Sequence, residues 1–206
     1  TKKYHPKQRL WYIRAKEVVI SSGSIERPLV FGNNDTPGIM LSSAAKEYLK
    51  VYGVLVGKKP LIFTNNDSGY ETAIEFKRNG VDPIILDTRK EPKSEIIEEA
   101  KNLAIQIKFS YVVVAAKGYK KVKSAEIAKI SDDKNELGQL ESINCDCICV
   151  SGFWTPTIHL ASQSGNKTKF DKDIDAFVPG ESKQNETTLG AANGTFTLEQ
   201  TLKNSF

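Results

Sequence analysis

The stretch FTNNDSGYETA, residues 63–73, follows an apolar run and precedes an amphipathic one. It therefore occupies the strand-to-helix turn in which a dinucleotide-binding fold carries G-x-G-x-x-G. Thr64 and Asn66 stand at the first two glycine positions, and Gly69 stands at the third. The third glycine lets the helix pack on the strand, whereas the second lets the backbone approach a pyrophosphate. The stretch predicts a Rossmann-like turn in which the Asn66 side chain obstructs phosphate binding.

The residues around this stretch alternate between apolar runs and amphipathic periods. The pattern predicts strands at Lys59–Phe63 and Asp82–Asp87 and helices at Gly69–Asn79 and Ser94–Gln106. Strands that alternate with helices are typical of a parallel sheet. The period then changes to two, which predicts an antiparallel hairpin of Lys108–Ala116 and Lys121–Ser131 around a turn at Gly118.

The flanking sequence predicts further elements on both sides of this core. They are short strands at Leu10–Ile13 and Lys16–Ile20, a helix at Leu41–Tyr52 with Ser42 or Ser43 as N-cap and Gly53 as its stop, strands at Ile143–Val150 and Ile174–Val178, and a helix at Leu198–Lys203.

Asp87 ends the second predicted strand, where an acidic residue can bind a ribose 2′-hydroxyl. The alternative is an acidic residue in a polar turn, because Thr88, Arg89 and Lys90 follow it. Since two fingerprint glycines are absent, the polar turn is the preferred interpretation, and ribose binding stays open.

Composition excludes several classes of protein. The 206 residues carry a formal net charge of +4 that is spread along the chain, which argues against nucleic-acid binding. The longest apolar runs, such as Tyr111–Ala116, are far shorter than the ~20 residues that span a bilayer, and no charged-then-apolar leader opens the sequence. We therefore expect a soluble, cytoplasmic protein without membrane contact. The chain begins with Thr1 and its only methionine is Met40, so we expect a piece of a longer protein.

The cysteines and histidines do not form a recognisable site. Cys145, Cys147 and Cys149 recur at every second residue, so on one strand they would share a face, and a packed face is more plausible than a zinc site. His5 and His159 are far apart and have no neighbouring ligand cluster. We predict no metal site in this chain.

The order of a nucleotide-type βαβ unit, a hairpin and a returning strand resembles the pyridine nucleotide-disulfide oxidoreductase fold. In that fold a nested domain is inserted in an outer nucleotide-binding domain. The resemblance implies an α/β chain in which a nested Rossmann-like domain, with a parallel sheet and a β-hairpin, interrupts an incomplete outer domain. The implied bounds are 1–56 for the outer domain's first part, 57–151 for the nested domain and 152–206 for the returning part.

Three stretches give a narrower resemblance: RLWYIRAKEVVISSGSIERPLVF (9–31), FTNNDSGYETA and VSGFWTPTIHLASQSG (150–165). They resemble the alpha-subunit family of heterotetrameric sarcosine oxidases. The resemblance implies an oxidoreductase complex that demethylates sarcosine to glycine, using O2 and tetrahydrofolate. It implies NAD in the alpha subunit, FMN at the alpha–beta interface and FAD in the complex, neither flavin being held by this fragment alone. It implies amine oxidation in the beta subunit, and therefore no catalytic residue in this chain. It also implies beta, gamma and delta subunits as partners, and tetrahydrofolate binding through a missing C-terminal domain.

The same resemblance implies where NAD lies, namely in the outer domain near TTLGAANGTFTLEQTL (187–202). By motif position the cofactor contacts are Ala191, Phe196 and Leu198, with Gly194 providing clearance. The residues agree, because a small-residue loop precedes a capping box that begins at Thr197. Flavoprotein relatives carry an aspartate where this chain has Asn193, which argues against flavin binding here. An ordinary glycine-containing turn remains the alternative.

Two other functions remain open. A similar subunit could serve an opine, proline or other secondary-amine dehydrogenase. Alternatively, the nested domain could be a non-catalytic scaffold that binds a partner subunit, which the altered loop at Asn66 favours.

Overall fold

The computed structural model describes residues 7–131 and 136–204. The chain forms two compact units: unit 1 comprises Thr1–Ile25 and Thr155–Phe206, and unit 2 comprises Glu26–Trp154. Two short strands, β2 (Ser24–Glu26) and β11 (Trp154–Pro156), contain the points at which the chain passes between the units, and they pair with each other. Unit 2 is therefore an insertion within unit 1.

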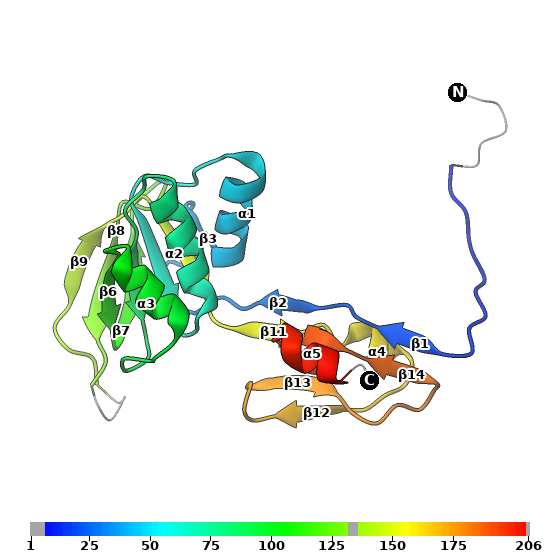
Figure 1. The fold of residues 1–206 in the computed structure, drawn as a ribbon. Coiled ribbons are helices and arrows are strands. Elements are labelled where there is room, and N and C mark those ends of the chain that lie inside the picture. The colour runs from blue at the N-terminus through cyan, green and yellow to red at the C-terminus, as the bar shows by residue number, and fades with distance from the viewer. Residues whose placement is uncertain (1–6, 132–135, 205–206) are drawn as a thin grey trace. The chain divides into compact units, whose positions relative to one another are not determined.

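Unit 2 is built on a five-stranded parallel sheet with the strand order β3-β10-β4-β5-β6 (Figure 1). The strands are β3 (Ile39–Leu41), β4 (Pro60–Thr64), β5 (Ile84–Asp87), β6 (Gln106–Phe109) and β10 (Cys147–Ser151). Because β10 joins β3 to β4, the last strand in sequence lies inside the sheet. The predicted parallel α/β fold is confirmed.

Both faces of this sheet are covered. Helices α1 (Ser42–Tyr52), α2 (Ser68–Arg78) and α3 (Glu95–Asn102) cover one face, and an antiparallel sheet of β7 (Tyr111–Lys117), β8 (Ser124–Lys129) and β9 (Glu141–Asn144) covers the other (Figure 1). The alternation along β4 shows why: Ile62 packs in the helical core, while Leu61 and Phe63 pack in the core beneath β7 and β8. A strand buried on both faces needs a nearly continuous apolar run, which β4 supplies from Pro60 to Phe63.

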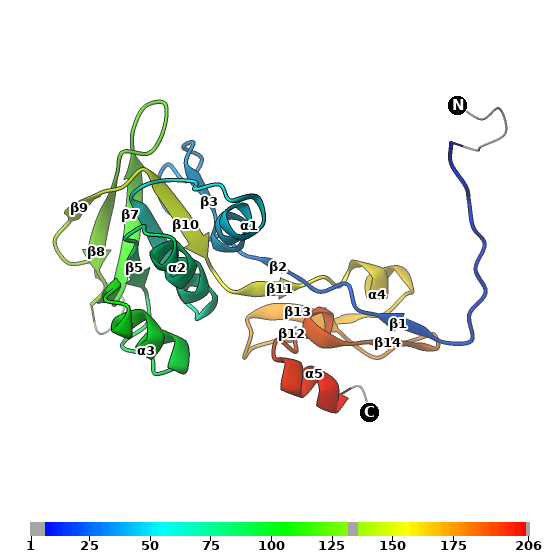
Figure 2. The ribbon, with the colours of Figure 1, turned by 45° about the horizontal axis from the view of Figure 1, so that its top comes forward.

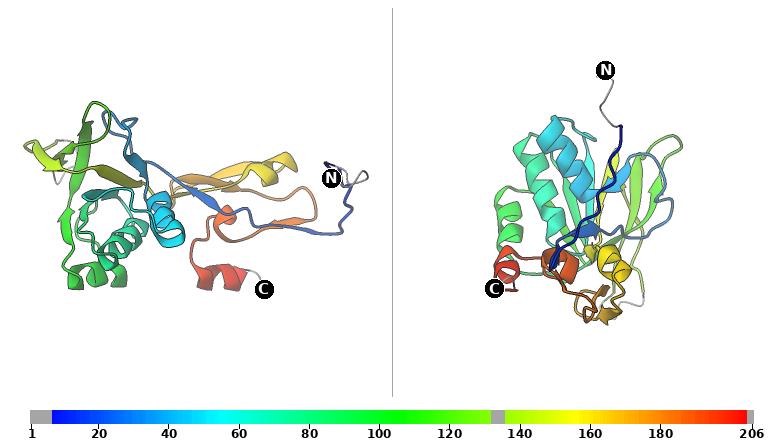
Figure 3. Two further views of the ribbon diagram at one scale, coloured as in Figure 1. Left: turned by 90° about the horizontal axis from the view of Figure 1, so that it is seen from above. Right: turned by 90° about the vertical axis from the view of Figure 1, so that its right-hand side faces the viewer.

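The nested domain predicted from the sequence differs from unit 2 at its beginning. The prediction started it at residue 57, whereas the compact unit starts at Glu26. The difference arises because β3 adds to the parallel sheet through β10, and α1 packs beside α2 (Figure 3). Both elements precede residue 57.

Two predicted strands are each divided between two sheets. The predicted strand 108–116 is wrong because β6 ends at Phe109 and β7 begins at Tyr111, and Ser110 between them has φ 58°. The helix predicted to reach Gln106 ends at Asn102, since Gln106 already belongs to β6. A left-handed residue reverses the chain locally, which a period of two in hydrophobicity does not reveal.

The predicted strand 143–150 is divided in the same way. β9 ends at Asn144 and β10 begins at Cys147, with a bend at Asp146. The Asp146 carboxylate accepts hydrogen bonds from the backbone N–H groups of Lys58 and Lys59, each at 2.8 Å. These bonds hold the bend at the entrance to β4 and separate the antiparallel sheet from the parallel one.

Helix α1 confirms its predicted stop and corrects its predicted start. Gly53 ends the helix with φ 64°, the left-handed conformation of a C-terminal glycine. The N-cap is Leu41, which has no side-chain acceptor, and neither Ser42 nor Ser43 occupies that position. Instead the Ser43 N–H donates to Oε2 of the buried Glu26 at 2.8 Å. The Glu26 carboxylate, distant in sequence, thus accepts the hydrogen bond that an N-cap side chain would normally accept.

Unit 1 contains two small sheets (Figure 2). β1 (Val18–Ile20) pairs in parallel with β14 (Glu186–Thr188), and β12 (Thr168–Asp171) pairs antiparallel with β13 (Ala176–Pro179). The unit also contains α4 (His159–Gln163), the 3-10 helix η1 (Gly190–Asn193) and α5 (Leu198–Asn204), which confirms the last predicted helix. Residues 10–13 form no strand, contrary to the prediction (Figure 3). Their side chains are exposed.

Candidate functional site

The loop from Thr64 to Gly69 lies at the carboxyl edge of the parallel sheet, where open α/β folds bind ligands. The Thr64 hydroxyl donates to the carbonyl oxygen of Asn66 at 2.8 Å and accepts from the Asn66 N–H at 3.1 Å. This side-chain turn replaces the glycine turn of a dinucleotide-binding loop. Asn66 lies outside the left-handed region, so the loop turns without the glycine-like conformation that the fingerprint uses.

The Asn66 side chain is buried and fully bonded. Its Nδ2 donates to the carbonyl oxygen of Ser151 at 3.1 Å and contacts the Oδ1 of Asn65 at 3.0 Å. Its Oδ1 accepts from the Ser68 N–H at 2.9 Å. Ser68 is the first residue of α2, and an amide at that position is one that a pyrophosphate would bind. The Asn66 side chain therefore projects into the loop, as the sequence predicts, and its Oδ1 accepts the Ser68 N–H hydrogen bond that a phosphate would otherwise accept.

Gly69 has the packing role that the sequence predicts. A Cβ atom at this position would lie 2.7 Å from both Cβ and Oγ1 of Thr64. Any larger residue would push α2 away from β4. The third fingerprint glycine is thus required by the fold, independently of any ligand.

Asp87 is held in a buried network and does not face an open ribose site. Its Oδ2 accepts from the Tyr70 hydroxyl at 2.7 Å, and its Oδ1 accepts from the Arg89 N–H at 2.9 Å. The Arg89 guanidinium donates to Oδ1 through Nε at 3.1 Å and to Oδ2 through Nη2 at 2.8 Å, and Nη2 also lies 2.8 Å from the Asp67 carboxylate. The carboxylate has no exposed surface, so the protein already supplies the donors that a ribose would offer.

The network explains two perturbed groups. Burial, reinforced by the hydrogen bond to Asp87, raises the pKa of Tyr70 well above its usual range. Burial alone would lower the pKa of Arg89, but the carboxylates of Asp87 and Asp67 outweigh it and hold that pKa above its ordinary value. The sequence did not identify Tyr70 or Arg89 as a partner of Asp87. The available signal was the arginine two residues after the aspartate, at the end of the strand.

The three cysteines do not share one face, contrary to the prediction. Cys147 and Cys149 lie on β10 and face the helical core, whereas Cys145 precedes the bend and packs in the core beneath β7 and β8. Burial raises the pKa of Cys145 to about 12. A hydrogen bond with Cys147 and burial raise the pKa of Cys149 well above its usual value. These two thiols stay protonated at neutral pH, so neither is an activated nucleophile.

Within residues 7–131 and 136–204, no three His, Cys, Asp or Glu side chains cluster as metal ligands would. His159 is exposed at the start of α4, and His5 lies outside the described residues. No helix in the described part of the chain is long and apolar enough to cross a bilayer.

Trp154 contacts the first turn of α2, because its Nε1 donates to the Ser68 hydroxyl at 2.8 Å.

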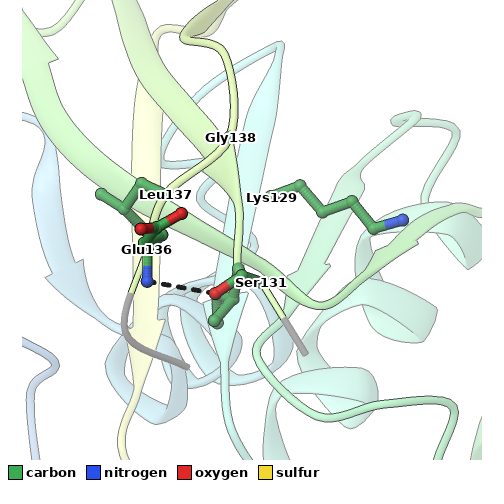
Figure 4. A pocket seen from close by; sticks show the side chains of 6 residues that line it. Lys129, Ser131, Glu136, Leu137 and Gly138 are labelled. Carbon is green, nitrogen blue, oxygen red and sulfur yellow. Dashed lines mark hydrogen bonds between the residues drawn. The ribbon is translucent and has the colours of Figure 1, made fainter. Parts of the chain in front are cut away.

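A surface pocket of 290 Å³ lies where β8 approaches Leu137 (Figure 4). Its polar contact is a hydrogen bond from the Glu136 N–H to the Ser131 hydroxyl at 3.1 Å. Lys129, Leu137 and Gly138 complete the labelled lining (Figure 4). The Lys129 side chain points away from Glu136, so the acid and the base of this lining do not act on a common point (Figure 4).

In unit 1 the predicted cofactor residues follow the carboxyl ends of a parallel pair. β1 and β14 end together, and the Leu189 N–H donates to the Ile20 carbonyl oxygen at 2.9 Å before η1 begins. Ala191 and Phe196 are partly buried, whereas Leu198 is 75% exposed. The structure thus places these residues along one short loop and the first turn of α5.

Gly194 provides clearance for packing within the protein. It has φ 78°, and a Cβ atom there would lie 3.0 Å from side-chain carbons of Ile174 and Val178. The predicted capping box is formed on one side, because the Gln200 N–H donates to the Thr197 hydroxyl at 3.3 Å.

Solved structures share this fold. The thioredoxin reductase of T. acidophilum matches 91% of this chain and 61% of its own, with a TM-score of 0.70 and 18% identity. The L-proline dehydrogenase of P. horikoshii matches 86% of this chain and 30% of its own, with a TM-score of 0.57 and 21% identity. These likenesses confirm the predicted α/β fold with its Rossmann-type parallel sheet.

Curated sequences extend the likeness to one family, although no family model matches the chain. The sarcosine oxidase subunit alpha of Corynebacterium sp. (strain P-1) is 35% identical over 192 residues, 92% of this chain and 20% of the relative. That of Rhizobium meliloti (strain 1021) is 37% identical over 195 residues, 91% of this chain and 18% of the relative. Over the fifth of the relatives' length that it spans, this chain belongs to the sarcosine oxidase alpha-subunit family.

Proposed function

We propose that this chain is part of the NAD-holding region of a sarcosine oxidase alpha subunit. The complex would demethylate sarcosine to glycine with O2 and tetrahydrofolate. The observation that carries the proposal is 35–37% identity to alpha subunits across both units of the chain. Beta, gamma and delta subunits would complete the complex, and FMN and FAD would belong to it outside this chain.

The proposed NAD site is the loop that follows β14. Its support is topological, because ligands of parallel α/β sheets bind beyond the carboxyl ends of the strands. Gly190, Ala191 and Ala192 give this loop small side chains, so a cofactor can approach its backbone. Ala191, Phe196 and Leu198 would contact NAD, and Gly194 would hold the loop against β13. These residues would bind and orient NAD, which when bound is a hydride carrier; none of them transfers a proton.

The experiment that tests the site uses the intact complex. Replacing Ala191 with leucine adds bulk to the loop, so we expect the purified complex to lose most of its NAD, measured after acid extraction. Lys172→Leu is the matched control, because Lys172 is exposed on the β12–β13 turn of the same unit. Wild-type NAD content in the Ala191→Leu complex would refute the site.

A second role is favoured for unit 2. The Asn66 and Asp87 contacts are satisfied within the protein, so we infer that unit 2 is a structural module that binds no dinucleotide. Unit 1 would then be the nucleotide-binding part of the chain.

The amine substrate is tested separately. The fold shared with L-proline dehydrogenase keeps an alternative in view, in which the subunit serves a proline, opine or other secondary-amine dehydrogenase. Oxidation of sarcosine by the purified complex, with little turnover of proline or opines, is the expected result. Faster oxidation of proline or an opine than of sarcosine would contradict sarcosine as the substrate and would leave the proposed NAD site unaffected.

A further inference from the structure

The chain contains two Asn-Gly pairs, Asn79-Gly80 and Asn193-Gly194. Asparagine is a chemically labile residue, because the backbone nitrogen of the next residue can attack its side-chain carbonyl carbon. A glycine in that next position leaves the nitrogen accessible, since it has no side chain to shield it. Both asparagines are exposed, so neither the sequence nor the exposure distinguishes the two pairs.

The two side-chain amides differ in their hydrogen bonds. The Asn79 Nδ2 donates to the Glu75 carbonyl oxygen at 2.9 Å and to the Glu75 Oε1 at 3.2 Å, so this amide is held against the last turn of α2. Among residues 7–131 and 136–204, none forms a hydrogen bond with the Asn193 side chain. The Asn193 amide can therefore rotate toward the following nitrogen without breaking a side-chain bond.

The backbone around the two pairs differs as well. Each glycine N–H donates to a backbone carbonyl oxygen, at 3.1 Å in Gly80 and at 3.2 Å in Gly194, so these two bonds are alike. Asn79, however, follows the 11 residues of α2, whose inner side is buried, whereas Asn193 ends the four residues of η1. A short helix with few buried contacts opens locally at a lower free-energy cost than a long packed one. Local opening frees the Gly194 nitrogen for reaction.

We propose that Asn193 is a site of spontaneous deamidation. The Gly194 nitrogen forms a bond with the Asn193 Cγ and gives up its proton. The side-chain amide nitrogen takes that proton and leaves as ammonia. Water then opens the cyclic imide at one of its two carbonyl carbons. One opening gives aspartate and the other gives isoaspartate, so the net reaction consumes water, releases ammonia and needs no oxidant or cofactor.

Isoaspartate at position 193 would change the loop that we propose as the NAD site. In isoaspartate the main chain passes through the side-chain carbon, so the chain gains an atom before Gly194. The loop is closed by two bonds, from the Gly194 N–H to the Ala191 carbonyl oxygen at 3.2 Å and from the Thr195 N–H to that of Gly190 at 3.1 Å. A longer main chain displaces both donors, and we expect NAD to be released. This consequence rests on the proposed function, whereas the modification itself does not.

The modification is measured on the full-length subunit. After incubation at mildly alkaline pH, peptide mass measurement should find deamidation at Asn193 roughly tenfold faster than at Asn79, because η1 opens more readily. Asn193→Gln is the control, since glutamine must form a larger ring and should keep its amide. Equal rates at the two asparagines, or a faster rate at Asn79, would overturn the proposal.

Hydrogen exchange tests the physical cause. The Gly194 amide should exchange faster than the Gly80 amide, because both donate to one carbonyl oxygen and differ in the stability of the surrounding helix. Slower exchange at Gly194 would contradict the local opening on which the faster reaction depends.

The consequence for NAD is measured on the intact complex. During the same incubation the wild-type complex should lose NAD, measured after acid extraction, in proportion to the isoaspartate formed at position 193. The Asn193→Gln complex should keep its NAD. Equal loss from both complexes would overturn the effect on NAD. Absence of NAD from both complexes before incubation would refute the proposed function, and the deamidation rates of the subunit would still decide the modification.

Discussion

The Oδ1 of Asn66 accepts a hydrogen bond from the backbone N–H of Ser68 at 2.9 Å, at the first turn of α2. In a dinucleotide-binding loop that amide is available to a phosphate oxygen. Here a side chain from the loop itself occupies it, and the Nδ2 of the same side chain bonds Ser151 on the neighbouring strand. The Asn66 side chain therefore connects the loop after β4 to β10 and to the first turn of α2 by hydrogen bonds.

Removing the Asn66 amide should destabilise unit 2. The substitution Asn66→Ala leaves the buried Ser151 carbonyl oxygen and the Ser68 N–H without this partner, at a cost of about 1–3 kcal/mol. Urea unfolding measures the difference. Asn102→Ala is the control, since Asn102 is exposed in the last turn of α3 and should change stability by less than about 0.5 kcal/mol. Equal effects at the two positions would contradict the linking role of Asn66.

ADP should not bind at the carboxyl edge of unit 2. Nuclear magnetic resonance of the whole chain distinguishes the two units, because each amide reports on its own surroundings. We expect the amide resonances of Asn65–Ser68 to stay unchanged at millimolar ADP. Saturable shifts at these amides would show that the Asn66 side chain yields to a phosphate.

Substitution of Gly69 by alanine should destabilise unit 2 through overpacking. The new Cβ would meet Thr64 at 2.7 Å, and forced contacts of this kind cost about 1–3 kcal/mol. The control is Gly138→Ala, whose Cβ would have its nearest neighbour at an ordinary 3.4 Å. The double variant Thr64→Gly/Gly69→Ala should lose less stability than the two single changes together, because the overlap is removed. Strict additivity would exclude the overlap as the cause.

The Tyr70–Asp87 bond predicts a dependence of stability on alkaline pH. The pKa of Tyr70 is raised in the folded state, so its contribution is complete below the unfolded value of about 10. Above that pH the unfolded chain releases the phenolic proton while the folded chain keeps it. Stability then falls by about 1.4 kcal/mol per pH unit for this group. The stability advantage of wild type over Tyr70→Phe should therefore shrink between pH 10 and 11, and a constant advantage would disprove the assignment.

The buried thiols predict a similar loss at lower pH. The folded pKa of Cys145 is about 12, whereas an unfolded cysteine titrates near ~8.5. Its contribution is complete below that pH and is lost as pH rises toward 12. Cys145→Ala should reduce the slope of unfolding free energy against pH between 9 and 10 by about 1.4 kcal/mol per unit. A slope shared by variant and wild type would show that this thiol ionises in the folded state.

The helices and their limits were largely predictable because their signals are local. Gly53 ends α1 as a glycine after the last apolar position should, and Gly69 keeps the helix-packing role of its fingerprint position. The start of α1 was not predictable, because its capping carboxylate comes from Glu26, far away in the sequence. Periodicity gives no sign of such a partner.

The division of strands between sheets was also hidden. Residues 108–116 and 143–150 are each apolar enough for one strand, yet Ser110 and Asp146 turn the chain from one sheet to the other. Cys145 faces away from Cys147 for the same reason. At the candidate site, the obstruction by Asn66 was expected from its size, whereas the Arg89 clamp on Asp87 depends on tertiary contacts.

The position of β10 has a consequence for how the unit assembles during synthesis. β3 and β4 share no ladder with each other; each pairs with β10, through Ile148 opposite Ile39 and Leu61. A chain growing from its N-terminus therefore makes β4, β5 and the hairpin well before the strand that joins β3 to them. Until residue 151 has emerged from the ribosome, the ladder edges of β3 and β4 stay unpaired and open to foreign strands.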